Sequence, residues 1–213
     1  AIDEEDHAHD AEEMARRLQE KACWAGNTCK VLELQGGLTT PNGLDRSNGF
    51  ADTLKQLAPN VTLIQRPTEW TADMAADAAQ NVLTQNPDLT GIFMASELMA
   101  TAVNAQLNAA GHGAAVGEAD SVIRVAIDGT PQGLQLIREG ALDATVSQPL
   151  SAYATKTAEL IELVKGGGTI DIGPRDDGRV IETPVGPQYQ LNATLVTSAN
   201  VDAADLWGNQ IGN

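Results

Sequence analysis

Five side chains that could bind a small molecule follow predicted β-strands. The loop after the first strand leads to Arg46, and the loops after the later strands give Trp70, Ser96, Asp128 and Gln148. Carboxylate and guanidinium groups form strong, directional hydrogen bonds, and vicinal hydroxyls can take part in them. An indole ring can cover the apolar C–H face of a ligand ring. Taken together, these residue types suit a neutral, polyhydroxylated ligand.

The segment around Asp128 indicates which kind of sheet positions these residues. The β-branched run Val122–Ile127 ends at Asp128, Pro131 stands where a helix would begin, and Ala144–Ser147 is the next predicted strand. Proline is favoured at the first helical position, and the order strand, turn, helix, strand is typical of a parallel βαβ unit. Ligands bind beyond the carboxyl ends of the strands in such sheets. We therefore expect the five side chains to meet at one edge.

Strands and helices alternate over most of the chain. Further strands are predicted at Lys30–Gln35, Val61–Ile64 and Gly91–Ala95, and helices at 4–21, 43–57, 71–86, 97–110 and 151–165. This order predicts an α/β fold with a doubly wound parallel sheet. After Gly168 the pattern changes. Residues 174–186 are expected to form an irregular crossing segment, and 180–183 and 190–196 are candidate strands.

Composition and charge exclude several classes of function. The 213 residues carry a formal net charge of −16, which argues against binding to a nucleic-acid backbone. No apolar stretch approaches the length of a membrane span, and the chain has no signal-peptide pattern, so an exported protein would already have lost its signal. The acidic segment 1–20 is predicted to form a helix with a solvated face. On such a helix, His7 and His9 would face different directions, so we expect a solvated acidic face rather than a metal site.

Patterns that support catalysis are missing from the sequence. The chain contains neither a G-x-S-x-G elbow nor a phosphate-binding glycine pattern after a strand. Its three histidines, at positions 7, 9 and 112, fall in a predicted exposed helix and a loop, where a Ser–His–Asp triad is hard to assemble. We expect a protein that is not an enzyme and that holds neither a cofactor nor a metal ion.

The two cysteines lie close together in the sequence. Cys23 and Cys29 flank a short polar segment, whereas a zinc site would need about four ligands. The pair is either a loop-closing disulfide or two free thiols. Because no other cysteine is present, we favour the Cys23–Cys29 disulfide and an oxidising compartment.

Several motifs occur in order and at matching spacing: Val31–Gly36, Arg46–Phe50, Gln80–Asp88, Ile127–Pro131 and Ala144–Gln148. On these motifs, from about Ala8 to Gly168, the chain resembles the periplasmic sugar-binding proteins of ABC importers. The resemblance is to the ribose- and galactofuranose-binding type, the type I periplasmic binding proteins. These share their fold with the effector domains of LacI-type repressors.

The resemblance implies two similar lobes that are joined by three crossing segments and hold a ligand between them. It assigns residues 1–148 to the C-terminal lobe, and 149–168 to a crossing segment and a helix of the other lobe. It assigns 169–213 to a crossing segment, terminal strands and a tail. The other lobe is otherwise largely absent, so the apolar side of the helix 151–165 has no obvious cover. We therefore hypothesise a fragment, a natural short form, or a chain that associates with itself.

The resemblance also implies roles for individual residues. Arg46 matches an arginine that hydrogen-bonds sugar hydroxyls, and Trp70 matches an aromatic residue that lines the sugar ring. Asp128 matches a binding carboxylate, with Ile127 beside it, and Gln148 matches a glutamine at the last crossing.

Two further candidate positions depart from the family pattern. Ser96 stands where the family usually has an amide side chain, so a hydroxyl replaces a group that both donates and accepts. Gly37 stands where a larger apolar residue can occur, which predicts a wider pocket.

Each candidate also has a purely structural interpretation. Asp128 could serve only as a turn residue and helix cap, and Ser96 only as an N-cap. Trp70 could be ordinary packing, Arg46 a surface charge on a helix, and Gln148 a plain hinge residue before a proline.

The function implied by the resemblance is that of the solute-binding component of an ABC importer, binding a monosaccharide or similar polyol. Its expected partners are the sugar and a membrane permease, with no nucleic acid. Its expected location is the periplasm or the cell exterior, with a lipid anchor in a Gram-positive host as one form. The alternatives are the effector domain of a LacI-type regulator and a sugar-binding module that presents its ligand to a chemotaxis or quorum-sensing receptor.

Overall fold

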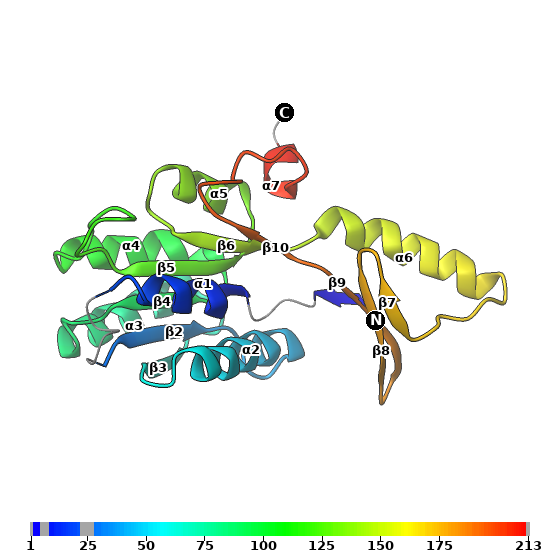
Figure 1. Cartoon of the computed structure of the whole chain (residues 1–213), viewed down its shortest axis with the longest axis horizontal. Coiled ribbons are helices and arrows are strands. Elements are labelled where there is room, and N and C mark those ends of the chain that lie inside the picture. Colours follow the sequence, from blue (N-terminus) through cyan, green and yellow to red (C-terminus); the bar gives the residue numbers. More distant parts are fainter. Residues whose placement is uncertain (1, 5–8, 22–27, 212–213) are drawn as a thin grey trace.

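The larger part of the molecule is built on a six-stranded sheet with strand order β10-β6-β5-β4-β2-β3 (Figure 1). The computed structural model describes residues 2–4, 9–21 and 28–211. Five strands are parallel, and their bounds are β2 Lys30–Gln35, β3 Thr62–Pro67, β4 Gly91–Met94, β5 Ile123–Asp128 and β6 Ala144–Ser147. Strand β10 (Thr194–Val196) closes one edge and is antiparallel to β6. The chain order reverses between β2 and β4, and ligands bind at such switch points.

Helices cover both faces of this sheet and bury a hydrophobic core on each. On one face lie α1 (His9–Leu18) and α2 (Pro41–Leu57), where Phe50 stacks on Phe93 with ring centroids 4.0 Å apart. On the other face lie α3 (Ala72–Gln85), the short 3-10 helix η1 (Glu97–Met99), α4 (Ala100–Ala109) and α5 (Pro131–Arg138). This arrangement confirms the predicted doubly wound α/β fold.

Side-chain caps mark where several of these helices begin. The hydroxyls of Thr40, Thr71 and Thr130 accept a hydrogen bond from a backbone N–H in the first turn of α2, α3 and α5. Such caps satisfy amides that have no partner within the helix. Pro41 and Pro131 occupy the first positions of α2 and α5, where a missing N–H costs nothing.

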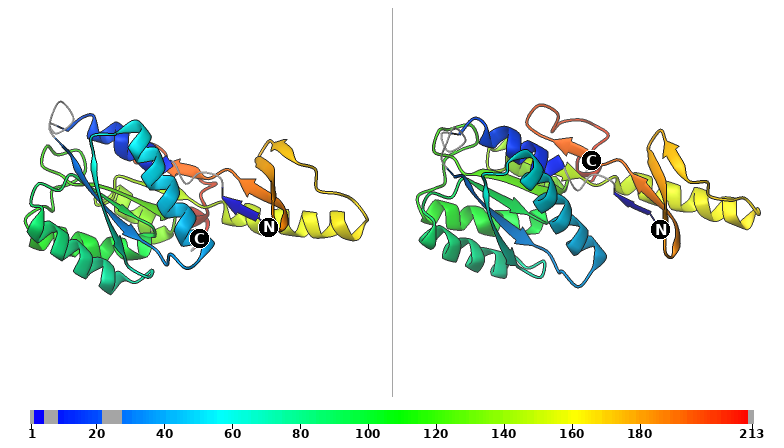
Figure 2. Two further views of the ribbon diagram at one scale, coloured as in Figure 1. Left: turned by 90° about the horizontal axis from the view of Figure 1, so that it is seen from below. Right: turned by 60° about the horizontal axis from the view of Figure 1, so that its bottom comes forward.

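The smaller part of the molecule is an arm that extends away from the six-stranded sheet, as Figure 2 also shows from two other sides. It consists of α6 (Leu150–Lys165) and a four-stranded sheet of order β1-β9-β8-β7. These strands are β1 (Ile2–Glu4), β7 (Gly173–Arg175), β8 (Gly178–Thr183) and β9 (Gly186–Leu191). The chain enters the arm between β6 and α6 and leaves it between β9 and β10. Within the segment 169–213, β7, β8 and β9 lie in the arm, whereas β10 belongs to the larger sheet.

Three expectations about the elements are wrong. The helix predicted from residue 4 begins at His9, because Glu4 pairs in β1. The segment 174–186 is not irregular, since it supplies β7 and β8 to an antiparallel hairpin. The strand predicted over 190–196 is two strands: β9 pairs in the arm, and β10 pairs with β6 after the break at residues 192–193.

The predicted disulfide falls partly outside the described residues. Cys29 is buried and is not a free thiol, but Cys23 lies outside the described part, so its pairing with Cys29 stays a prediction. Within the described residues, no helix has both the length and the apolar character needed to cross a membrane.

Candidate functional site

The carboxylate of Asp128 is the centre of a hydrogen-bonded group at the carboxyl edge of the parallel sheet. Its Oδ1 accepts bonds from Arg46 Nη1 at 3.1 Å and Gln148 Nε2 at 2.7 Å. Its Oδ2 accepts a bond from the Ser96 hydroxyl at 2.6 Å. Arg46 comes from α2, Ser96 follows β4, Asp128 ends β5 and Gln148 follows β6. The structure thus brings together four of the residues that the sequence predicts.

Arg46 is not a surface charge, since the residue is only 2% exposed. Besides Asp128, its Nη1 donates to the carbonyl of Ala95 at 2.7 Å. Its guanidinium also lies over the Trp70 ring, 5.7 Å from the ring centroid. These contacts hold Arg46 at the strand ends, where a buried guanidinium can bind hydroxyl oxygens.

Trp70 forms the wall of the site next to β2, and glycines make room for its indole. A Cβ atom at Gly36 would lie 2.2 Å from the Trp70 ring, and one at Gly37 would lie 2.8 Å from Trp70 Nε1. Trp70 itself adopts a left-handed backbone with φ of 63°, which turns its loop. The expectation of a wider pocket beside Gly37 is therefore wrong on this wall, because the indole occupies that room.

The turn that carries Asp128 is held by Glu97, which was not among the residues predicted for the site. Glu97 is 3% exposed and accepts hydrogen bonds from the backbone N–H groups of Gly129 at 2.9 Å and Thr130 at 2.8 Å. It also accepts from the hydroxyls of Thr130 and Thr145. Burial raises the pKa of Glu97, and the hydrogen bonds from Thr130 and Thr145 oppose that shift. In the sequence, the only pointer to this role was that an acidic residue, Glu97, directly follows Ser96 after a predicted strand.

The structure shows which of the candidate residues have a purely structural role. Ser96 caps η1 by accepting from Leu98 N–H and also donates to Asp128, so it has both roles. Asp128 is not the cap of α5, because Thr130 is. Ile127 lies in the core beneath α1 and α2, next to the polar group rather than within it.

Asp10 is a second buried acid that the sequence analysis assigned to a solvated face. Its side chain is 1% exposed, and neither carboxyl oxygen has a hydrogen-bond partner among the described residues. Burial raises the pKa of Asp10 well above its usual range. The charge of Arg46 lowers it in part, and the charges of Glu97 and Asp128 raise it further. The acidic pattern of segment 1–20 gave no signal of which carboxyl turns inward.

Chemically, this edge can bind uncharged hydroxyl groups. It offers a carboxylate, a guanidinium, an amide, a hydroxyl and an aromatic face within one hydrogen-bonded group. The described residues contain no group of three or more His, Cys, Asp and Glu placed to hold a metal ion.

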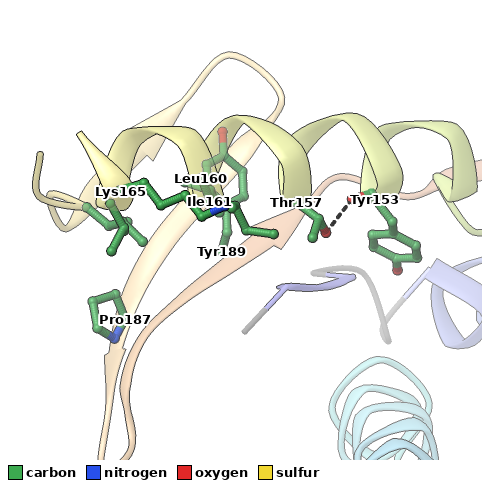
Figure 3. A pocket seen from close by; sticks show the side chains of 9 residues that line it. Tyr153, Thr157, Leu160, Ile161, Lys165, Pro187 and Tyr189 are labelled. Atoms are coloured by element: carbon green, nitrogen blue, oxygen red, sulfur yellow. Dashed lines mark hydrogen bonds between the residues drawn. The ribbon is translucent and has the colours of Figure 1, made fainter. Parts of the chain in front are cut away.

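The arm carries a separate, apolar groove between α6 and β9 (Figure 3). Its volume is about 640 Å³, and its lining includes Tyr153, Leu160, Ile161, Pro187 and Tyr189. No residue of α6 is buried, and Ile161 is 49% exposed. The arm sheet therefore covers only part of the apolar surface of α6.

The known proteins that this chain resembles are binding proteins. A family model described as "Periplasmic binding protein domain" matches residues 9–168. A ribose import binding protein of Salmonella typhimurium is 32% identical over 143 residues, which cover 67% of this chain and 46% of that protein. A D-apiose import binding protein of Paraburkholderia graminis is 28% identical over 185 residues, covering 85% of this chain and 52% of that protein.

A solved ABC transporter solute binding protein from Agrobacterium vitis, with bound D-fucose, has a TM-score of 0.73 to this structure. At 19% identity, over 97% of this chain and 63% of that one, the likeness concerns the fold. The chain spans about half the length of the curated relatives it matches. Both of those relatives are import binding proteins, which agrees with the expectation that the chain is not an enzyme.

Proposed function

The chain belongs to the periplasmic binding protein domain family, and from this membership we propose that it supplies one wall of a sugar-binding site in an ABC importer. The observation that carries the proposal is the convergence of Arg46, Ser96 and Gln148 on the Asp128 carboxylate. Trp70 supports it by lying beside Arg46, where a sugar ring could stack.

In this proposal the polar group recognises neighbouring hydroxyls of a monosaccharide or similar polyol. Asp128 accepts hydrogen bonds from sugar hydroxyls, and Arg46 donates to their oxygens. Because the carboxylate already takes three side-chain donors, the group is held in place before the ligand arrives. Such preorganisation reduces the entropy cost of binding.

The arm, in this proposal, is part of a second lobe that closes over the ligand. Chain segments pass between the larger sheet and the arm beside Gln148 and at residues 192–193, and such segments can serve as hinges. The apolar groove of α6 and β9 is then covered by the remainder of that lobe. The membrane permease of the importer is the expected protein partner, and the periplasm or the cell exterior is the expected location.

The substitution Asp128→Asn tests the proposal by calorimetric titration of the complete natural protein with D-ribose, D-allose, D-apiose and D-fucose. We expect the wild type to bind at least one of them. Hydrogen bonds to charged groups contribute about 1.5–3 kcal/mol, so D128N should bind roughly 10- to 150-fold more weakly. The control is Asp88→Asn, at an exposed aspartate that pairs only with Lys30 among the described residues.

D88N should bind as the wild type does. Equal affinity of D128N and wild type would contradict the assignment of Asp128. Absence of binding to every sugar by the folded wild type would contradict the proposed function itself.

A further inference from the structure

The C-terminal tail returns to the larger sheet and docks beside the turn that carries Asp128. It ends in the short helix α7 (Trp207–Gln210), which lies next to α5 (Figure 1). Val201 and Leu206 are buried in the core, and Arg138 of α5 donates to Asp202 at 2.8 Å. The tail is therefore anchored independently of the polar group of the site.

One side chain of the tail reaches the site directly. The indole N–H of Trp207 donates to the backbone carbonyl of Asp128 at 2.9 Å. The same carbonyl accepts the backbone N–H of Gln148 at 3.1 Å. Next to Trp207, a Cβ atom at Gly208 would lie 2.4 Å from the carbonyl oxygen of Gly129, so the tail packs closely on this turn.

The backbone at this point is one that needs support. Asp128 has a φ of 140°, a region that side chains other than glycine rarely adopt. Such conformations persist only where the surroundings hold them in place. Glu97 accepts from the backbone N–H groups of Gly129 and Thr130, and Trp207 donates to the carbonyl of Asp128, so this turn is held by two side chains.

We propose that Trp207 is a positioning residue for sugar binding: its indole N–H fixes the Asp128–Gly129 peptide and thereby the direction of the Asp128 carboxylate. This inference rests on the proposed function of the same site. It adds a residue that does not belong to the group around the carboxylate and that lies 79 positions away in the chain.

The surroundings of Trp207 also connect the tail to the crossing segments. A cavity of about 230 Å³ beside the tail is lined by Leu206 and Trp207 together with Gln148, Pro149 and Thr194. The hydroxyl of Ser151, which also lines this cavity at the start of α6, donates to Gln210 at 3.4 Å. Trp207 thus lies where the chain leaves the larger sheet for the arm. It donates to the carbonyl of Asp128, as does Gln148, the first residue of that crossing.

The test compares Trp207→Phe with Asp202→Asn in the complete natural protein. W207F keeps an aromatic ring and removes the N–H, whereas D202N weakens another anchor of the tail, on an exposed carboxylate away from the site. Removing one neutral hydrogen bond should weaken binding of the sugar identified by titration about fivefold to tenfold. D202N should leave the affinity unchanged.

A second readout needs no ligand. Amide hydrogen exchange at Gln148 N–H should be faster in W207F than in the wild type and unchanged in D202N, because only W207F removes one of the two donors that hold the shared carbonyl in place. Unchanged exchange and affinity in W207F would overturn the inference. So would equal losses in W207F and D202N, which would indicate general docking of the tail. If the wild type binds no sugar, the proposed function fails, and exchange at Gln148 still decides whether Trp207 positions this peptide.

Discussion

At the scale of single residues, the site depends on carboxyl groups that lie in very different surroundings. Asp128 is half-buried and accepts three side-chain donors, whereas Asp10 is fully buried and has no hydrogen-bond partner among the described residues. A carboxylate that is held by several donors has a fixed direction in which it can meet a ligand. A carboxyl that is buried without donors favours its neutral form and makes folding depend on pH.

Substitution of Asp10 by Asn should therefore stabilise the protein at neutral pH. Arg46, His9, Glu97 and Asp128 are the charged or titratable groups that act on Asp10, and burial outweighs the lowering by Arg46. The folded-state pKa is raised, so the unfolded chain ionises first as the pH rises above 3.8, and stability falls from there up to the raised pKa. Because asparagine does not ionise, D10N removes this loss of stability.

Urea denaturation of D10N and wild type at pH 7 and pH 4 measures the effect. The free energy of unfolding should be higher for D10N at pH 7, and the difference should shrink at pH 4. The control is Asp52→Asn, an exposed position on α2, which should show neither change. A D10N protein that is less stable than the wild type at pH 7 would mean that a charged Asp10 supports Arg46.

At the scale of elements, the turn between β5 and α5 is the part on which the site depends most. The Thr130 hydroxyl accepts from Gly133 N–H at 2.9 Å as the cap of α5 and donates to the buried Glu97 carboxylate. Thr71 caps α3 in the same way, but its hydroxyl donates to a backbone carbonyl, that of Thr68. The main difference between the two caps is therefore the acceptor of the hydroxyl: a buried carboxylate for Thr130 and a backbone carbonyl for Thr71.

Thr130→Ala should consequently cost more stability than Thr71→Ala. Loss of a cap costs about 1 kcal/mol, which is the expectation for T71A. T130A also leaves a buried carboxylate short of a donor, so we expect about 2–3 kcal/mol. Urea denaturation of both variants at pH 7 measures the difference. Equal losses would mean that the Thr130–Glu97 bond contributes nothing to stability.

The elements also show which structural features sequence patterns could predict. The βαβ order and a capping role for Ser96 were predicted correctly because they depend on neighbouring residues. The break between β9 and β10 was missed, since residues 190–196 form one continuous strand pattern and the division arises from pairing with two different sheets.

The site residues also divide into those that local patterns predict and those that they do not. Arg46, Ser96, Asp128 and Gln148 were predicted to meet because each follows a strand of one parallel sheet, and the structure brings them together. Asp10 and Trp207 were missed for a different reason. Their positions depend on how a helix and a tail dock on the sheet, and no local pattern records that docking.

At the scale of the whole molecule, the larger sheet offers one binding wall and the arm offers an incompletely covered apolar surface. The chain spans about half the length of its curated relatives, and the groove of α6 and β9 is where further structure would pack. In the function we propose, this chain is half of a two-lobed binding protein, and its contacts to the sugar centre on Asp128.

Native mass spectrometry of the complete protein, purified from its own host, tests this claim most directly. We predict a chain heavier than 22.3 kDa that carries one monosaccharide, and loss of that sugar in D128N but not in D88N. A bare 22.3 kDa chain, or a ligand-free dimer of it, would contradict the account, because the half-protein would then be the complete product and would retain no sugar.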